Sequence, residues 1–161
     1  MKTCKIYKGA IIVNGSFVFE MLGGDFSTFA KGAYKRLGID YPKFFKMDAL
    51  SKLAFLGVEY LLEGFSSEEK EGLALVFANH SASLDTDLRH QETIQDPNNY
   101  YPSPAIFVYT LPNICLGEIA IRHGLRTESS FFIFDQYPSE FFSQYSQFLL
   151  QAGKAKKVLC A

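Results

Sequence analysis

The polar segment 79–87 carries the residue types that hydrolytic sites use. It contains His80, Ser81, Ser83, Asp85 and Asp87. A hydroxyl, an imidazole and a carboxylate can serve as nucleophile, general base and orienting acid. The segment follows an apolar stretch of strand length, which is where α/β proteins place chemistry. A hydrolase is therefore one hypothesis, although the chain has no Gly-x-Ser-x-Gly elbow.

Metal and cofactor chemistry find less support. His80 with the Asp85-x-Asp87 pair offers possible ligands, but their spacing fits no established pattern, and a solvated acidic turn is the favoured interpretation. The three cysteines are widely spaced and form no CxxC pair, which argues against a zinc site or a disulfide framework. No GxGxxG or GxxxxGK[ST] loop occurs. We therefore expect no metal and no cofactor.

Two further candidates have ordinary structural explanations. His90 and His123 could act as bases, but His123 precedes Gly124 at an expected helix end, where a cation meets the negative end of the helix dipole. Cys115 lies within an apolar stretch, where a small buried thiol is common.

Composition excludes some partners. The net charge is −1 and no stripe of Lys and Arg is present, so nucleic-acid binding is not expected. The apolar stretch 9–13 is too short for a signal peptide, and no run reaches the length of a membrane span. We expect a single cytoplasmic domain over residues 1–161. The basic residues of segment 154–157 are interpreted as a solvated helix end.

The first residues predict a hairpin. Residues 5–13 are rich in Ile and Val and are typical of a strand. Asn14-Gly15 supplies a type I′ turn, and residues 16–20 return as a second strand.

Two helices are predicted next. Asp25 is a suitable N-cap for a helix over 26–37, which Gly38 ends. Over 50–62, apolar residues recur at i, i+3, i+4 and i+7, the strongest helical pattern in the chain. Further apolar residues lie outside that stripe, so this helix should contact protein on more than one side.

The middle of the chain predicts a strand followed by a loop. Residues 73–78 are continuously apolar, as in a strand covered on both faces. Residues 79–103 are polar and rich in Pro and Asn, which predicts a long irregular loop of the kind that often has a function. Residues 105–110 are predicted as a short strand or extended segment.

The remaining elements complete an alternating pattern. A helix over 113–123 is apolar enough to be buried nearly all round. Residues 130–135 are predicted as a strand, and Pro138 begins a last helix that Gly153 ends. Strands that alternate with helices indicate an α/β layered domain.

Two stretches of this pattern resemble the N-terminal half of β-ketoacyl synthases. The run "YTLPNICLGEIAIRHGL" followed by "SSFFIFDQ" is similar to the family's buried helix and the strand leading to its nucleophile. The upstream "YPKFFKMDALSKLAFLGVEYLL" resembles the family's early helix, and the likeness spans roughly residues 40–150. The resemblance implies an α/β thiolase-like half-domain, with helices packed on a mixed sheet.

The resemblance places Gln136 at the nucleophile position. In the family, a cysteine stands there at a sharp turn from strand to helix, where the helix dipole and free amides lower the thiol pKa. Here the turn is Asp135-Gln136-Tyr137-Pro138, without cysteine or serine. An amide cannot accept an acyl group as a thioester. The same replacement is characteristic of chain-length factors, the inactive partners of ketosynthases.

The resemblance therefore implies a 3-oxoacyl-ACP-synthase-like pseudoenzyme of fatty acid, polyketide or aryl-polyene synthesis, with no confident catalytic residue. The family's remaining catalytic groups come from a C-terminal half that this chain does not contain. An exposed apolar face left by that half would need a cover, which implies a homodimer or a ketosynthase-type partner, and acyl carrier protein as a further partner. A small acyl- or aromatic-ligand-binding module, using an apolar groove beneath residues 79–104, is the alternative.

Overall fold

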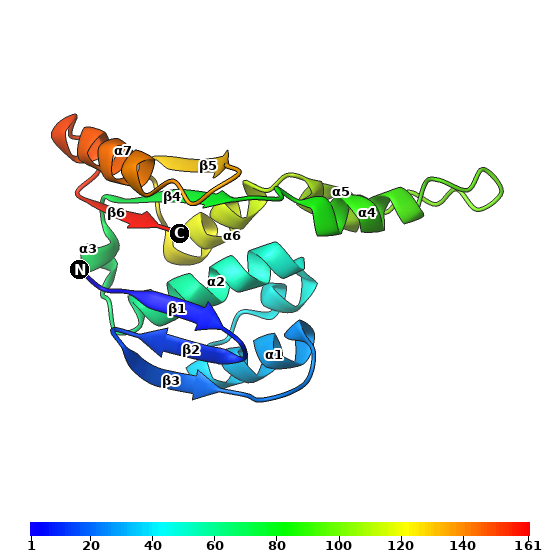
Figure 1. Ribbon diagram of the computed structural model, residues 1–161, viewed down its shortest axis with the longest axis horizontal. Helices are drawn as coiled ribbons and strands as arrows, with labels where there is room; N and C mark the ends of the chain where they lie inside the picture. Colours follow the sequence, from blue (N-terminus) through cyan, green and yellow to red (C-terminus); the bar gives the residue numbers. More distant parts are fainter. The chain divides into compact units, whose positions relative to one another are not determined.

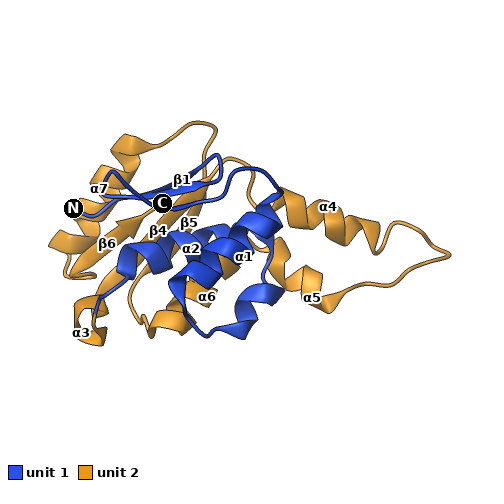
Figure 2. Cartoon of the chain, turned by 90° about the horizontal axis from the view of Figure 1, so that it is seen from below, with its two compact units in different colours: residues 1–65 blue, residues 66–161 orange.

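The strands form two separate three-stranded sheets. The computed structural model describes residues 1–161, which gather in two compact units, residues 1–65 (unit 1) and residues 66–161 (unit 2), coloured separately in Figure 2. Seven α-helices accompany the sheets, so the predicted α/β class is confirmed. The expected single mixed sheet does not form, because the sheet of unit 1 is antiparallel and that of unit 2 is parallel. The single domain over residues 1–161 stays a prediction.

The sheet of unit 1 is a meander of three short strands. They are β1 (Cys4–Tyr7), β2 (Ala10–Val13) and β3 (Ser16–Glu20). The Asn14-Gly15 turn is confirmed, with φ of 51° and 83°. The single strand expected over residues 5–13 is wrong, because Lys8 and Gly9 also take positive φ and turn the chain back. A Cβ at Gly9 would lie 2.4 Å from the backbone oxygen of Met21, so this turn requires glycine.

Helices pack beside this sheet in unit 1 (Figure 1). They are α1 (Phe26–Leu37), the 3₁₀ helix η1 (Pro42–Lys46) and α2 (Ala49–Leu62). Asp25 caps α1 by accepting a 2.8 Å hydrogen bond from the Thr28 amide, and Gly38 ends it with φ of 63°, both as predicted.

The buried side of α2 differs from the predicted stripe. Leu53, a member of the stripe, is 41% exposed, whereas Phe55 and Leu56 are fully buried. Tyr60 is also buried and donates a 3.0 Å hydrogen bond to the Ala33 carbonyl. Phe55 and Tyr60, which lie outside the predicted apolar stripe, therefore belong to the core of unit 1. Large aromatic side chains contribute more buried area than the aliphatic residues of the stripe.

The elements of unit 2 surround a parallel sheet of order β5-β4-β6. They are α3 (Ser67–Lys70), β4 (Leu73–Asn79), α4 (Leu84–Glu92), α5 (Pro104–Phe107), η2 (Val108–Thr110), α6 (Ile114–His123), β5 (Ser129–Ile133), α7 (Ser139–Gln151) and β6 (Lys157–Cys160). β4 is central and nearly all buried, as its continuous apolar run predicts.

Helices α6 and α7 lie on opposite faces of this sheet (Figures 1 and 2). Parallel crossovers are right-handed, and the chain moves from β4 to β5 and then back across to β6, which requires opposite faces. The α7 face has its own core of Ala74, Val76, Phe142, Leu149 and Ala155. α6 is not buried all round as expected, because Ile121 is 69% exposed.

Two predictions between β4 and α6 are wrong. Residues 84–92 of the expected irregular loop form α4, and the expected extended segment 105–110 forms α5 and η2. Ser103 caps α5 by accepting a hydrogen bond from the Ile106 amide, and Pro104 occupies its first turn. Residues 105–110 include β-branched and aromatic residues that favour a strand, but no other strand lies beside them to pair with, and they form helical turns instead.

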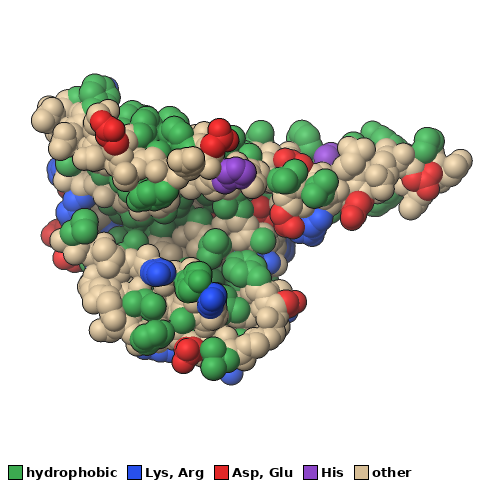
Figure 3. Space-filling model, in the orientation of Figure 1, with side chains coloured by type: hydrophobic (Ala, Val, Ile, Leu, Met, Phe, Trp, Pro, Cys, Tyr) green, Lys and Arg blue, Asp and Glu red, His purple; other side chains and the backbone are tan.

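The segment from α4 to η2 (residues 84–110) projects from the sheet of unit 2 as an arm (Figures 1 and 2). Hydrophobic side chains are visible along it in Figure 3, and Leu88, Tyr101 and Phe107 are 60%, 80% and 57% exposed. At its base, the hydroxyl of buried Ser83 donates a 2.6 Å hydrogen bond to the Thr110 carbonyl.

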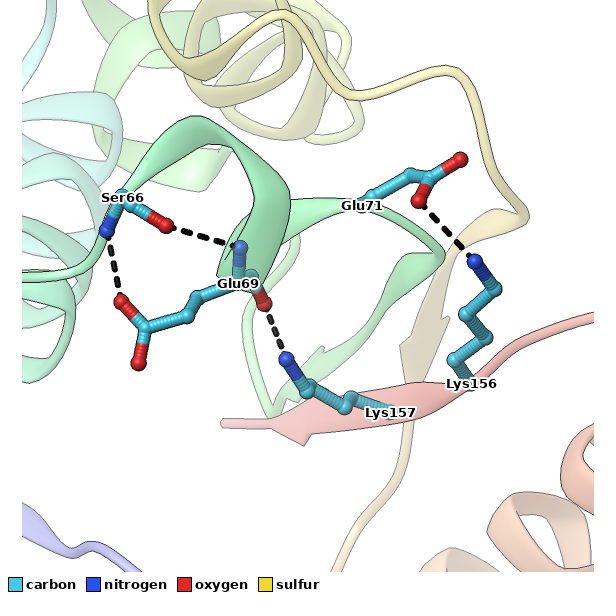
Figure 4. A network of polar contacts seen from close by, with 5 residues as sticks. All are labelled: Ser66, Glu69, Glu71, Lys156 and Lys157. Atoms are coloured by element: carbon cyan, nitrogen blue, oxygen red, sulfur yellow. Dashed lines mark hydrogen bonds and ion pairs between the residues drawn. The ribbon is translucent and has the colours of Figure 1, made fainter.

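The C-terminal residues form a strand rather than a solvated helix end. The Lys156 amide donates a 2.8 Å hydrogen bond to the Gly72 carbonyl at the start of β4. The Lys156 ammonium pairs with Glu71 at 3.0 Å, and the Lys157 ammonium donates to the Glu69 carbonyl (Figure 4). Glu69 also closes a capping box with Ser66 at the start of α3. These contacts join the two ends of unit 2.

No helix by itself has both the length and the apolar content that a membrane crossing requires. The α5–η2 and α6 segments meet these criteria only when taken together, and they are bent by 97° where they join.

Candidate functional site at the carboxyl edge of the parallel sheet

The carboxyl ends of β4 and β5 lie side by side. Asn79 pairs with Ile133, and the Phe134 amide donates a 3.0 Å hydrogen bond to the Asn79 carbonyl. From β4 the chain leads to α6, and from β5 it leads to α7 on the opposite face. Such a change of direction is the topological switch point at which open α/β sheets bind ligands. Segments 79–83 and 134–138 therefore form the candidate site.

The first segment is held by one asparagine. The Asn79 side chain accepts a 2.9 Å hydrogen bond from the Ala82 amide and donates a 2.8 Å bond to the Ala82 carbonyl. Ala82 has a φ of 48°, a left-handed conformation that is unfavourable for a residue with a Cβ. The two hydrogen bonds compensate for that strain and fix the direction in which the arm leaves the sheet.

Gln136 lies in the second segment, between the end of β5 and the start of α7. This is the strand–turn–helix position that the sequence predicts, but β5 is an edge strand and not the central strand. Gln136 and Tyr137 are exposed, and no side chain caps α7. The Ser139 amide donates a 3.2 Å hydrogen bond to the Tyr137 carbonyl, so the backbone of the turn, and not a side chain, supplies the acceptor at the start of α7.

Aromatic packing holds α7 in place below this turn. Phe132 of β5 meets Phe141 edge to face at 4.7 Å and Tyr145 at 5.6 Å between ring centroids. Phe141 and Tyr145 stack at 5.5 Å along the helix. Such ring pairs contribute stabilisation beyond that of the apolar area they bury. They therefore hold together β5 and α7, the strand and the helix that flank Gln136.

The predicted Ser/His/Asp constellation does not assemble. The Ser83 hydroxyl donates to Thr110 and to Asp87 at 3.1 Å, which occupies it at the base of the arm. The His80 ring shares a 3.2 Å hydrogen bond with Ser81, and both residues are exposed. Since no bond links His80 to Asp85 or Asp87, nothing orients the imidazole as a general base.

The other candidates occupy structural positions. His123 ends α6 before Gly124, which has a φ of 66°, and Cys115 is 1% exposed within that helix. His90, in the last turn of α4, packs against Phe107 with centroids 5.4 Å apart. No three side chains of His, Cys, Asp or Glu are grouped as a metal site.

The thiols lie elsewhere. Burial raises the pKa of half-buried Cys4, which Lys2 partly offsets. Cys160 is exposed on β6 and meets the Ser146 hydroxyl at 3.2 Å. No cysteine occupies segment 79–83 or 134–138.

Sequence reasoning did not foresee that the 79–83 segment leaves the sheet beside the end of β5. An apolar strand followed by Asn-His-Ser was visible, but the neighbour of that strand was not, because strand order depends on distant residues. Comparison with protein-family models and with curated proteins finds no match.

Proposed function

We propose that the protein is a non-catalytic β-ketoacyl-ACP-synthase-like subunit or scaffold, active in the cytoplasm in carrier-protein-dependent fatty acid, polyketide or aryl-polyene synthesis. The proposal rests on Gln136, an amide at a strand–turn–helix junction where the resembled enzymes carry their thiol. The position beside a topological switch point supports it, since ligands bind there in parallel sheets.

The missing nucleophile leads to the first test. An amide forms no thioester, so purified protein offered an acyl-carrier thioester should acquire no covalent acyl group. Intact-mass spectrometry measures this directly, with an active ketosynthase as the positive control. An acyl adduct on any residue of segment 134–139 would overturn the proposal.

A cysteine scan of α7 tests whether the turn is a nucleophile elbow. Gln136 precedes the helix and Gln151 ends it, so Gln136→Cys and Gln151→Cys form a matched pair in a Cys160→Ser background. The helix dipole should leave the thiol pKa at position 136 below that at position 151 by about half a unit or more. The pH dependence of iodoacetamide alkylation measures both values, and equal values would contradict an elbow.

The partner is proposed to bind along β5, because subunits of the enzymes that this chain resembles pair through the strand that precedes the nucleophile. β5 is an edge strand, and its even-numbered residues bond to β4, as the Phe134 amide does. The odd-numbered residues therefore direct their amides outward, where a second strand can pair. Ile133, at the outward position, is 56% exposed.

Proline substitution tests this edge. Ile133→Pro removes an outward amide from β5, and Cys160→Pro makes the equivalent change on the opposite edge, β6. We expect light scattering to show a dimer, or a complex with a ketosynthase-type partner, that Ile133→Pro dissociates and Cys160→Pro does not. An unassociated wild-type chain that binds neither itself nor such a partner would contradict the proposal.

A further inference from the structure

Helix α4 carries an exposed apolar stripe along the arm. Leu84 and Leu88 lie one turn apart on the same face of the helix and are 52% and 60% exposed. The other face of the helix is occupied, because Thr86 is buried and His90 packs against Phe107. Apolar residues at i and i+4 are the anchors with which a helix enters an apolar groove of a partner. We call Leu84 and Leu88 the leucine stripe.

Acidic side chains border the leucine stripe. Asp85 and Glu92 are exposed and lie beside the leucines on the outward side of the helix. The arm as a whole, residues 84–110, carries four Asp and Glu against one Arg. The rest of unit 2 has seven Asp and Glu against six Lys and Arg, so the acidic excess of unit 2 is concentrated in the arm. Since two such arms repel one another, the arm fits a basic partner.

Unit 1 contains a hollow of matching character. It has a volume of about 430 Å³, and its lining comes from β1, the turn at residues 8–9, the start of α1, and α2. Phe26, Phe29 and Leu53 give it apolar walls, and Tyr7 adds an aromatic ring that is 54% exposed. We call it the tyrosine hollow. Its volume is within the range of recessed binding sites in proteins.

Lysines make the rim of the tyrosine hollow basic. The ammonium groups of Lys5 and Lys8 lie 5.1 Å and 5.2 Å from the centre of the Tyr7 ring. Each ammonium has three N–H donors, so a lysine that contacts the ring can also pair with a carboxylate. Asp25 lines the hollow too, but its carboxylate accepts a hydrogen bond from the Thr28 amide at the positive end of α1, which offsets its charge. Unit 1 as a whole has nine Lys and Arg against six Asp and Glu.

We propose that the leucine stripe of α4 docks in the tyrosine hollow of a second copy of this chain. The two leucines enter the hollow, and the acidic side chains that border the stripe accept hydrogen bonds from the two lysines at the rim. Opposite charge selects this partner, because the basic unit attracts the acidic arm whereas the arms repel each other. One short helix buries less area than a standard interface, so we expect a transient contact with a Kd on the order of 10–100 µM. Since β5 takes no part, this contact adds to any pairing along that strand.

Charge exchange between two variants tests the proposal. The hollow variant, Lys5→Glu with Lys8→Glu, makes the rim acidic, and the arm variant, Asp85→Lys with Glu92→Lys, makes the border of the stripe basic. Each variant alone should self-associate about tenfold more weakly than its parent chain, because like charges then face each other. An equimolar mixture should associate as tightly as the parent chain, because each arm then meets a hollow of opposite charge.

Sedimentation velocity of the full chain measures this association over a range of protein concentrations. The parent chain and all variants carry Ile133→Pro, so that the result does not depend on whether strands pair along β5. Lys35→Glu with Lys46→Glu is the matched control for the hollow variant, because neither lysine lines the hollow, and it should leave association nearly unchanged. Leu88→Ala should weaken association about fivefold or more, whereas Leu150→Ala, at another exposed leucine, should not.

Three results would overturn the proposal once far-UV circular dichroism has shown that each variant is folded. The first is a mixture of the two charge variants that does not associate. The second is undiminished association of either variant alone, which would indicate contact between the arms or through another surface. The third is a parent chain that stays monomeric at all concentrations, as it would if the arm docked on its own chain.

Discussion

Units 1 and 2 build three-stranded sheets by opposite routes. In unit 1 each strand pairs with the next along the chain through a tight turn. In unit 2 the central strand pairs with partners far along the chain, so that Leu73 meets Lys157. Local pairing needs little loop closure, whereas distant pairing must compensate a larger loss of chain entropy. We therefore expect unit 1 to depend on its turns and unit 2 on its packing.

Charge also separates the units. Unit 1 has an excess of basic residues, whereas unit 2 has seven Lys and Arg against eleven Asp and Glu. The proposed pseudo-elbow at Gln136 lies in the acidic unit. The nearly neutral whole chain conceals this difference.

The largest expected effect is in the packing of unit 2. Leu149 is 1% exposed in the core between α7 and the sheet, so Leu149→Ala should lower the free energy of unfolding by about 2–5 kcal/mol. The adjacent Leu150→Ala, at a position 45% exposed, should change it by less than about 0.5 kcal/mol. Urea unfolding measures both. Hydrogen exchange should show lost protection in residues 66–161, and an equal loss in residues 1–65 would contradict separate units.

Glycine substitutions compare the turns of the two units. Gly9→Ala in unit 1 directs a Cβ at the Met21 carbonyl oxygen, which cannot move away, and should cost on the order of 2–3 kcal/mol. Gly72→Ala in unit 2 directs a Cβ at the first carbons of the Lys156 side chain, 2.7 Å from Cγ and 2.9 Å from Cβ, so Lys156 must shift and the cost should be on the order of 2 kcal/mol. The unfolding temperatures of the two variants should rank these two costs. Gly15→Ala, with positive φ and no near neighbour, isolates the backbone strain.

Tyr60 should give unit 1 a distinct sensitivity to alkali. Burial raises the pKa of Tyr60 to about 12, so between about pH 10 and 12 the unfolded chain loses this proton before the folded one. Stability should therefore fall as pH rises through that range. Tyr60→Phe removes the hydrogen bond to Ala33, costs about 1 kcal/mol at pH 7, and should flatten this decline. Denaturant titrations at pH 7 and pH 11 test both expectations.

The smallest expected effect is at the surface of unit 2. Lys156 and Glu71 form an ion pair in which both side chains are largely exposed, at 67% and 71%. Lys156→Gln should therefore lower stability by less than about 0.5 kcal/mol, and added salt should remove the difference. A larger loss in urea titrations would mean that the contacts of Figure 4 act cooperatively in joining β6 to β4.

Features written in a few adjacent residues were predicted well. The Asp25 cap, the Asn14-Gly15 turn and the glycine that ends α6 all appear as expected. The location of Gln136 between a strand and a helix follows from similar local signals. Lys8-Gly9 was missed because Lys is an unusual residue at positive φ.

Features that depend on neighbours were predicted poorly. The run 105–110 has strand-forming residues but forms helical turns, because Ser103 and Pro104 start a helix and no strand lies alongside. β6 was missed because its four residues follow a lysine-rich stretch and become a strand only beside β4. The candidate site was predicted in part: Gln136 was identified, whereas the pairing of Asn79 with the end of β5 was not.

The sequence by itself determined the ends of α1 and α6, the tight turn after β2, the buried central strand and the absence of a thiol between β5 and α7. Tertiary structure alone decided that the strands form two sheets, that β4 is flanked by β5 and β6, and that residues 84–110 project as an arm. The reason is physical: caps and turns act through hydrogen bonds within a few residues, whereas strand order follows from the free energy of pairing segments far apart in the chain.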